Sequence, residues 1–230
     1  MSDKGEQFGA SPAPVQIPHF AGDQTRLDSK DKWRAAILAE RAALSGQTAA
    51  AEANLLTEQV LTALALTAAS ASFAPASAVV AAYVPARDEP GSIGMLDALA
   101  AAGAQVLLPI TAPGNTLDWG QYHPEYPLTT ARYGLLEPTG PRLGAAALGT
   151  ADVIFVPALA VDRRGVRLGR GAGYYDRALA ATLVTGSVLA IVRDAEFVAE
   201  LPESAHDRRV DGVVTPVSGL MTISSDSSGE

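Results

Sequence analysis

The sequence predicts a three-layer α/β/α domain with a mainly parallel central sheet. Short apolar runs of strand length alternate with segments of helical character, as in parallel α/β folds. These runs are continuous rather than alternating, which is typical of strands buried on both faces. A chain of 230 residues can bury the substantial core that such a domain needs. We expect the domain to span residues 25–221, between disordered tails at 1–24 and 222–230 that lack apolar periodicity.

Two helices are expected before any strand. In the segment 30–44, apolar residues recur near helical spacing, and Asp28 or Ser29 supplies an N-cap. The segment 51–66 has the same periodicity, with its apolar residues on one side. The sheet is therefore expected to begin only after these two helices.

The following elements alternate between strand and helix. The apolar runs 78–84 and 106–110 enclose a helix that Ser92 can cap and that stops at Gly103. Such a unit is typical of a parallel sheet. Further along the chain the sequence predicts strand 152–156, helix 174–184 and strand 188–192.

An aromatic segment interrupts this alternation at residues 115–138. Aromatic side chains in irregular backbone can wall a pocket for a flat ligand. The alternative is a β-hairpin whose aromatic side chains cover the edge of the sheet, and for any single residue we favour this alternative. The residues concerned are Trp119, Tyr122, Tyr126 and Tyr133.

Composition excludes several classes of function. The formal net charge of −8 opposes a broad binding surface for nucleic acid or an anionic membrane. The absence of cysteine excludes disulfides, thiolate nucleophiles and cysteine-ligated metal sites. Because the sequence also shows no membrane span and no secretory signal, we expect a cytoplasmic protein without a membrane or nucleic-acid partner.

The segment from Arg167 to Asp176, with the sequence RLGRGAGYYD, favours phosphate binding. Its three alternating glycines allow backbone N–H groups to approach a ligand, and the helix that follows presents an N-terminus that attracts anions. It is neither a P-loop nor a dinucleotide-binding G-x-G-x-x-G motif. A flexible glycine turn is the alternative interpretation, but Arg167 and Arg170 beside the glycines of an acidic protein favour phosphate.

Acidic residues near this loop are candidate metal ligands. Asp176 suits Mg²⁺, which prefers one or two carboxylates together with phosphate oxygens, although a carboxylate there also stabilises a helix dipole. Asp211 is a second candidate. His206 and Asp207 could form an acid–base pair or simply a hydrogen bond within a loop. No G-x-S-x-G motif supports a hydrolase triad.

This loop resembles the signature of the 5-formyltetrahydrofolate cyclo-ligase family, R-L-G-R-G-x-G-Y-Y-D. All nine specified positions match. Further matching segments occur in the same order along essentially the whole expected domain. Together they identify the family far more specifically than any one segment does. The further matching segments are Lys30-x-x-x-Arg34, Tyr83-Val-Pro-x-x-Asp-Glu89, Tyr133-Gly-x-x-Glu-Pro138 and His206-Asp-x-x-Val-Asp211.

The resemblance implies three sets of site residues, with Arg170 and Tyr174 in catalytic roles. The implied ATP-binding residues are Lys30, Arg34, Arg167, Leu168, Gly169, Arg170, Gly171, Ala172, Gly173, Tyr174 and Tyr175. The implied folate-binding residues are Val84, Glu89, Arg170, Gly171, Ala172, Gly173 and Tyr174. The implied Mg²⁺ ligands are Asp176 and Asp211.

The resemblance also implies a reaction and its cofactors. ATP would phosphorylate the formyl oxygen of 5-formyltetrahydrofolate, and nitrogen-10 would attack the resulting iminophosphate to give 5,10-methenyltetrahydrofolate. Such chemistry needs Arg, Lys and Mg²⁺ for positioning and charge neutralisation, and no protein nucleophile. A monomer with only small-molecule partners, folate and ATP, is expected.

Two positions depart from the pattern of the family. Many members have a second acidic residue and then Thr after Glu89, where this chain has Pro90, Gly91 and Ser92. Some members have Lys at the position of Ala172, so that a phosphate contact is either missing here or replaced by another arginine, Arg163 or Arg164. These departures leave open a non-catalytic nucleotide- or folate-binding protein, and a different ATP-dependent ligase or kinase is a further alternative.

Overall fold

A computed structural model describes residues 28–86, 88–205 and 207–223. Its centre is a seven-stranded sheet with strand order β12-β11-β9-β6-β1-β2-β3. The five inner strands are parallel, and the two edge strands, β12 and β3, are antiparallel to their neighbours. These strands are β1 (Val79–Ala81), β2 (Gln105–Ala112), β3 (Thr116–Gln121), β6 (Val153–Pro157), β9 (Ser187–Ile191), β11 (Gly212–Thr215) and β12 (Gly219–Thr222).

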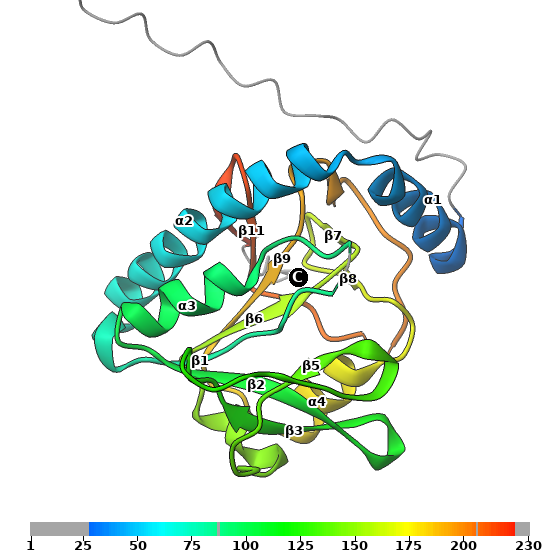
Figure 1. The fold of residues 1–230 in the computed structure, drawn as a ribbon. Coiled ribbons are helices and arrows are strands. Elements are labelled where there is room, and N and C mark those ends of the chain that lie inside the picture. Colours follow the sequence, from blue (N-terminus) through cyan, green and yellow to red (C-terminus); the bar gives the residue numbers. More distant parts are fainter. Residues whose placement is uncertain (1–27, 87, 206, 224–230) are drawn as a thin grey trace, which may run out of the picture.

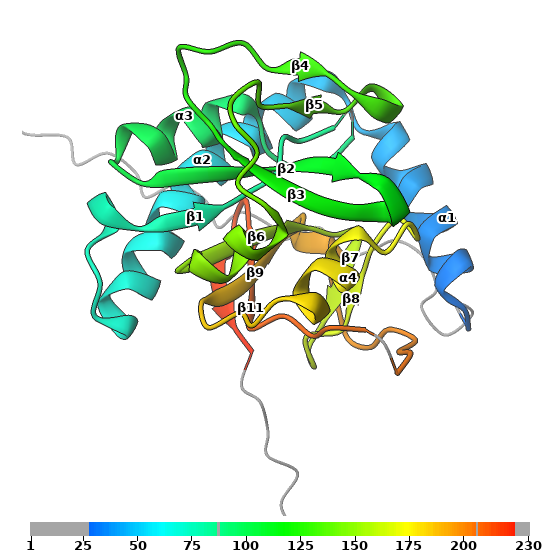
Figure 2. The same ribbon diagram turned by 90° about the horizontal axis from the view of Figure 1, so that it is seen from below.

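Helices cover both faces of this sheet (Figures 1 and 2). Helices α2 and α3 lie on one face, and α4 lies on the other with the short helix η5. The α-helices are α1 (Lys30–Ala43), α2 (Gly46–Ala71), α3 (Ile93–Ala101) and α4 (Tyr174–Ala181). The 3₁₀ helices are η2 (Pro75–Ser77), η3 (Pro113–Asn115), η4 (Arg132–Gly134), η5 (Ala145–Thr150) and η6 (Asp194–Glu196).

Alternate residues of the inner strands belong to two separate cores. In β6, Val153 and Phe155 pack with α2 and α3, whereas Ile154 and Val156 pack on the opposite side with Leu179 of α4. Because both of their faces are covered, inner strands such as β6 and β9 contain no polar alternation, which explains the continuous apolar runs in the sequence. The predicted three-layer architecture is confirmed.

Helix α1 packs away from the main sheet, against a small three-stranded sheet that the sequence analysis did not predict. Ser29 caps the helix by accepting a hydrogen bond from the Lys32 amide. Trp33 and Ile37, one helical turn apart, pack against the small sheet in a third apolar cluster. The small sheet consists of β7 (Ala160–Asp162), β8 (Arg167–Leu168) and β10 (Phe197–Val198).

The bounds of several elements differ from the prediction. Helix α2 begins at Gly46, directly after the cap Ser45, and is longer than the predicted 51–66 because Ala and Thr continue it at both ends. Strand β1 is shorter than the predicted 78–84 because the chain leaves the ladder after Ala81. The residues beyond it, including Val84, are therefore free to line a pocket.

The aromatic segment forms a hairpin at the edge of the sheet, as favoured above. Strand β3 pairs with β2 in antiparallel register, and a two-stranded ribbon of β4 (Thr129–Thr130) and β5 (Leu136–Glu137) follows. Trp119 is completely buried and Tyr122 nearly so. Burial of Tyr122 and its hydrogen bond to Asp97 raise the pKa of its phenol to about 12. These two aromatic residues therefore serve the core.

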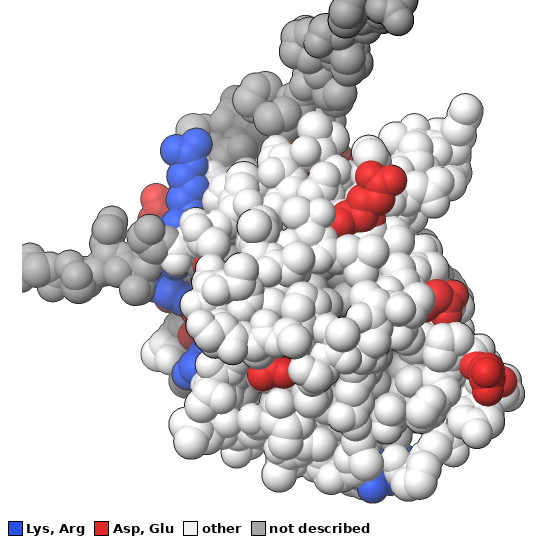
Figure 3. Space-filling model, turned by 90° about the vertical axis from the view of Figure 1, so that its left-hand side faces the viewer, with Lys and Arg blue, Asp and Glu red and all other residues white. Residues whose placement is uncertain are grey.

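The predicted tails lie almost entirely outside the described residues. At the C-terminal end, however, Thr222 belongs to β12 and pairs with Gly212, so the domain extends beyond residue 221. Among the residues that the structure describes, no helix is both long enough and apolar enough to cross a bilayer. On the face shown in Figure 3, most of the described surface is uncharged and its Lys and Arg side chains lie at the margins. This face offers no basic track for a nucleic-acid backbone.

Candidate active site

A pocket of about 920 Å³ lies at the carboxyl ends of three neighbouring strands. Tyr83 and Val84 follow β1, Thr111 lies near the end of β2, and Pro157 ends β6. The chain passes from β1 to β2 on one side and returns to β6 on the other, so the strand order reverses between β1 and β6. Open α/β sheets bind ligands in the crevice at such a switch point.

All but one of the predicted site residues line this pocket. The exception is Asp211. The predicted residues brought together are Lys30, Arg34, Val84, Glu89, Arg167, Leu168, Gly169, Arg170, Gly171, Ala172, Gly173, Tyr174, Tyr175 and Asp176. They come from α1, the loop after β1, strand β8, the glycine loop that follows it and the start of α4, so the fold gathers residues that are up to 146 positions apart in the sequence.

The glycine loop between β8 and α4 forms one wall of the pocket. Gly171 has φ +102° and Gly173 has φ +67°, which are conformations that residues with a side chain rarely adopt. Gly173 is the N-cap residue of α4 and no side chain caps the helix, so its first backbone N–H groups are not satisfied by a capping side chain. The loop thus combines accessible backbone with the positive end of a helix dipole.

Arg167 connects this loop to the central sheet. Its guanidinium donates to the Pro157 carbonyl at 3.2 Å and to a carboxylate oxygen of Asp176 at 2.5 Å. The Nε atom is buried and has no hydrogen-bond partner among the described residues. A buried donor without a partner is rare in native proteins unless a ligand or water satisfies it.

Helix α1 contributes two more cations. Arg34 donates from Nε to the Gly169 carbonyl at 3.0 Å, and its other side-chain contact is the exposed Asp31. Lys30 forms an ion pair with Asp207, with Nζ–Oδ distances of 2.5 and 2.7 Å. Both cations are therefore held at the pocket by contacts that the sequence spacing Lys30-x-x-x-Arg34 alone did not identify.

Asp207 is a site residue to which the sequence analysis gave only a tentative role beside His206, which lies outside the described residues. Burial of the Asp207 carboxylate by itself would raise its pKa. The hydrogen bonds from Lys30 and from the Ser204 amide outweigh burial, so the pKa of Asp207 is lowered below its ordinary value. An ionised carboxylate thus balances the charge of Lys30 in the pocket.

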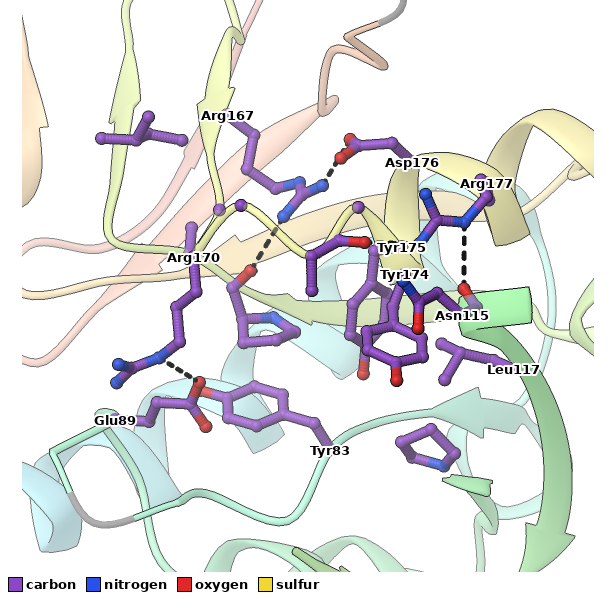
Figure 4. Close-up of a pocket in the computed structure, with 18 of the residues that line it drawn as sticks. Tyr83, Glu89, Asn115, Leu117, Arg167, Arg170, Tyr174, Tyr175, Asp176 and Arg177 are labelled. Atoms are coloured by element: carbon purple, nitrogen blue, oxygen red, sulfur yellow. Dashed lines mark hydrogen bonds and ion pairs between the residues drawn. The ribbon is translucent and has the colours of Figure 1, made fainter. Parts of the chain in front are cut away.

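Arg170 is held at the edge of the pocket by two carboxylates. Its Nη2 lies 2.5 Å from Asp88, and its Nε lies 3.3 Å from Glu89. Glu89 also accepts the Ala86 amide at 2.9 Å, which fixes the turn that carries both acids. Figure 4 shows Arg170 and Glu89 at one end of the pocket.

Arg177 lies at the opposite end, beside Asn115 (Figure 4). It donates to the Asn115 carbonyl at 3.0 Å and to the Ala172 carbonyl, and its guanidinium carbon lies 5.9 Å from the centre of the Tyr174 ring. No specific role for this residue was predicted from the sequence. A phosphate contact at Ala172 was expected to be either missing or replaced by Arg163 or Arg164, and neither of these arginines lines the pocket.

The remaining wall of the pocket is largely apolar. Trp119, Tyr122 and Tyr126 do not line it. The segment instead contributes Asn115, Leu117, Leu135, Leu136 and Glu137. Burial strongly raises the pKa values of the Tyr83 and Tyr175 phenols, and both therefore stay neutral. The Tyr175 hydroxyl is buried without a partner among the described residues. This wall suits a flat, partly apolar ligand.

The structure does not bring Asp211 to the pocket, which corrects its prediction as a metal ligand. Asp211 precedes β11, at the opposite end of the parallel strands, and its carboxylate accepts the Val188 amide at 2.8 Å. Its charge is therefore used to hold β9 and β11 in register. The aspartates that line the pocket are Asp176 and Asp207, and no group of three metal-binding side chains occurs within the described ranges.

A comparison with known protein families identifies the relatives of this chain. A model of the 5-formyltetrahydrofolate cyclo-ligase family matches residues 26–216. The chain belongs to this family. The identification from the glycine–arginine loop as a member of this enzyme family is thus confirmed.

Individual cyclo-ligases support this assignment. The 5-formyltetrahydrofolate cyclo-ligase of Mycolicibacterium smegmatis is 50% identical over 149 residues, which cover 63% of this chain and 76% of that protein. The Escherichia coli K12 enzyme of the same name is 32% identical over 141 residues, covering 60% of this chain and 77% of that protein.

Solved structures show the same fold. The NMR structure of Aquifex aeolicus 5,10-methenyltetrahydrofolate synthetase has a TM-score of 0.67 and 29% identity, and the match covers 87% of this chain and 96% of that one. A synthetase from Mycoplasma pneumoniae, at 17% identity, matches in fold with a TM-score of 0.62 over 80% of this chain and 97% of that one.

One departure from the cyclo-ligase pattern has a structural explanation. Gly91 has φ +104°, and an added Cβ would lie 3.2 Å from Pro85. It does not line the main pocket. Glycine at this position is therefore explained by the turn before α3, and the loss of a ligand contact is not needed to account for it.

Proposed function

We propose that this protein catalyses the ATP-dependent cyclisation of 5-formyltetrahydrofolate to 5,10-methenyltetrahydrofolate, releasing ADP and phosphate. The observation that carries the proposal is a single pocket with two chemically different sides. The glycine loop, with Arg34, Arg167 and Arg177, suits a polyphosphate, while Val84, Glu89 and the apolar wall suit a folate. A volume of about 920 Å³ allows both substrates to be held together.

The proposed reaction needs no covalent enzyme intermediate. The formyl oxygen attacks the γ-phosphorus of ATP as the bond to the ADP oxygen breaks, which gives an iminophosphate. Nitrogen-10 then attacks the formyl carbon and loses its proton, and phosphate leaves with the former formyl oxygen. Both steps depend on positioning and on compensation of phosphate charge, for which Arg170 and Tyr174 are the proposed catalytic residues.

Each proposed role corresponds to a contact in the pocket. Arg34 already bonds the loop at Gly169, so its guanidinium lies where phosphates would approach the backbone N–H groups. The Nε of Arg167 is a buried donor that a phosphate oxygen could satisfy. At the other end, Glu89 accepts the Ala86 amide with one oxygen, and its second oxygen faces Arg170. A carboxylate in that place can accept N–H groups of a pterin ring.

Magnesium fits this pocket as a companion of the nucleotide. One oxygen of Asp176 bonds Arg167, and the second has no hydrogen bond in the described part of the chain. Since Mg²⁺ is commonly bound by one or two carboxylates plus phosphate oxygens and water, Asp176 is the residue that would hold it, with Asp207 nearby. When bound, Mg²⁺ neutralises phosphate charge.

The experiment that tests the function is absorbance at the methenyltetrahydrofolate band after purified protein is mixed with 5-formyltetrahydrofolate, magnesium and ATP. We expect a rise that requires ATP, and the reaction without ATP is the control. A folded protein that binds nucleotide and folate but gives no rise would instead be the non-catalytic binding protein considered above. Turnover of ATP with other acceptors, and none with folate, would identify a different ligase or kinase.

Asp176→Asn is expected to shift the magnesium titration of activity to higher concentrations, by about tenfold, because the neutral amide is a weaker ligand for a hard cation. Activity would be measured against magnesium at a fixed ATP concentration. Asp211→Asn is the matched control: it removes the same charge at the opposite end of the strands, and its magnesium titration should coincide with that of the wild type. A shift in Asp211→Asn that equals the shift in Asp176→Asn would contradict the placement of the metal.

A further inference from the structure

Five cationic side chains line the pocket, and four of them are paired with carboxylates. Lys30 pairs with Asp207, Arg34 with Asp31, Arg167 with Asp176, and Arg170 with Asp88 and Glu89. The fifth is Arg177, which forms no ion pair with any residue that the structure describes. It is therefore the pocket cation whose charge is not compensated by a described neighbour.

The guanidinium of Arg177 lies along the glycine loop. It bonds the Ala172 carbonyl, and its Nη1 would lie 2.9 Å from a Cβ at Gly173, so that the absence of a side chain at Gly173 lets the guanidinium approach the loop. Of its five N–H donors, two bond backbone carbonyls, those of Ala172 and Asn115. The others have no acceptor in the described part of the chain, although the side chain borders the pocket.

We propose that Arg177 binds the polyphosphate of the nucleotide, on the α4 side of the glycine loop. This inference rests on the proposed function and adds a residue to it. Arg34 contacts the loop at Gly169, and Arg177 contacts it at Ala172, so the two guanidiniums flank the backbone N–H groups between them. A chain of phosphates crossing the loop would meet both, together with the N-terminus of α4.

Because its charge is not compensated, we expect Arg177 to contribute more to the first contact with nucleotide than the four paired cations do. The charge of each of the four paired cations is already partly compensated by a carboxylate, which reduces the gain from a new contact with phosphate. Arg177 keeps its bonds to neutral carbonyls and still has donors to offer. A carboxylate of the folate is the alternative anion, and separate titrations with nucleotide and with folate distinguish the two.

The test is calorimetric titration of full-length protein with a non-hydrolysable ATP analogue, and separately with 5-formyltetrahydrofolate. Loss of a charge-assisted hydrogen bond should raise the nucleotide Kd of Arg177→Gln by about 10- to 100-fold. Arg177→Lys should recover part of the affinity, because it keeps the charge but loses the planar fork. Arg163→Gln removes the same charge outside the pocket and should bind nucleotide like the wild type.

Two further measurements distinguish a phosphate contact of Arg177 from a purely structural role. Nucleotide affinity in Arg177→Gln should depend less steeply on NaCl concentration than in the wild type, whereas a distorted loop would leave that dependence unchanged. Folate affinity should not change, and thermal unfolding should show a folded variant. Wild-type nucleotide affinity in Arg177→Gln, an unchanged salt dependence, or a loss confined to folate would each overturn the inference.

Different results would contradict the role of Arg177 and the proposed function. If the wild type binds nucleotide and forms the methenyl product while Arg177→Gln binds nucleotide normally, the role of Arg177 is wrong and the function stands. If the wild type binds no nucleotide, the proposed function is wrong and the role of Arg177 falls with it.

Discussion

Replacing Arg170 with alanine should lower kcat/KM for cyclisation by about 100- to 1000-fold, the typical cost of removing one donor that stabilises developing charge in a transition state. Arg170 is the cation of the glycine loop that reaches the proposed folate end of the pocket, where it contacts Glu89 at 3.3 Å. Its guanidinium can thus lie between the formyl group and the phosphate that it receives. The rate of methenyltetrahydrofolate formation is the measurement.

A variant of its partner separates catalysis from the positioning of the loop. Asp88→Asn weakens the ion pair at 2.5 Å that holds Arg170, but it leaves the guanidinium in place. If Arg170 served only to tie the turn at residues 86–89 to the glycine loop, Asp88→Asn would lose as much activity as Arg170→Ala. We expect instead a much smaller loss, with both proteins folded by circular dichroism. Wild-type kinetics in Arg170→Ala would remove it from the proposed mechanism.

The glycine–arginine loop could be predicted from the sequence because its function depends on local backbone properties. The alternating glycines and the start of the helix lie within ten consecutive residues and can be recognised directly in the sequence. In the structure, Gly171 and Gly173 have the positive φ angles expected of such a loop. The three-layer architecture could also be predicted from the sequence, because strands that are buried on both faces, such as β6 and β9, require continuous apolar runs.

Residues whose role depends on long-range packing could not be predicted in this way. Asp207 and Asp211 are four positions apart in one polar stretch, and only the path of the chain into β11 decides that Asp207 reaches Lys30 while Asp211 binds the Val188 amide. Arg177 was not predicted as a site residue for a similar reason. Its contact with Asn115 spans 62 positions and depends on the hairpin between β2 and β3. The small sheet of two- and three-residue strands is too short to give a periodic signal.

A second large effect, on the free energy of unfolding, is expected at a buried ion pair next to the pocket. Arg41 of α1 and Glu196 form two hydrogen bonds of 2.6 and 2.8 Å, and both side chains are almost completely buried. Burial alone would lower the pKa of Arg41, but its hydrogen bond to Glu196 and the charge of that residue outweigh burial and raise it, so the guanidinium is charged. Arg41 also donates to the carbonyl of Ala158, which lines the pocket.

Glu196→Ala should therefore lower the free energy of unfolding by about 3–5 kcal/mol, because it leaves a buried guanidinium without its counter-ion. Unfolding in urea, followed by circular dichroism, is the measurement. Glu203→Ala is a matched control, since Glu203 forms the same two-bond contact with Arg209, at 2.8 Å for each bond, but on the surface. Solvent and salt screen that pair, so its loss should change stability little.

The comparison of the two variants tests whether burial, rather than the ion pair itself, sets the energy. Equal losses in Glu196→Ala and Glu203→Ala would contradict that explanation. Because α1 carries Lys30 and Arg34 as well as Arg41, the same variant should also weaken nucleotide binding at temperatures where the protein is still folded. The ion pair thus fixes the position of α1 against the strands whose ends form the pocket, and stability and ligand affinity are expected to fall together.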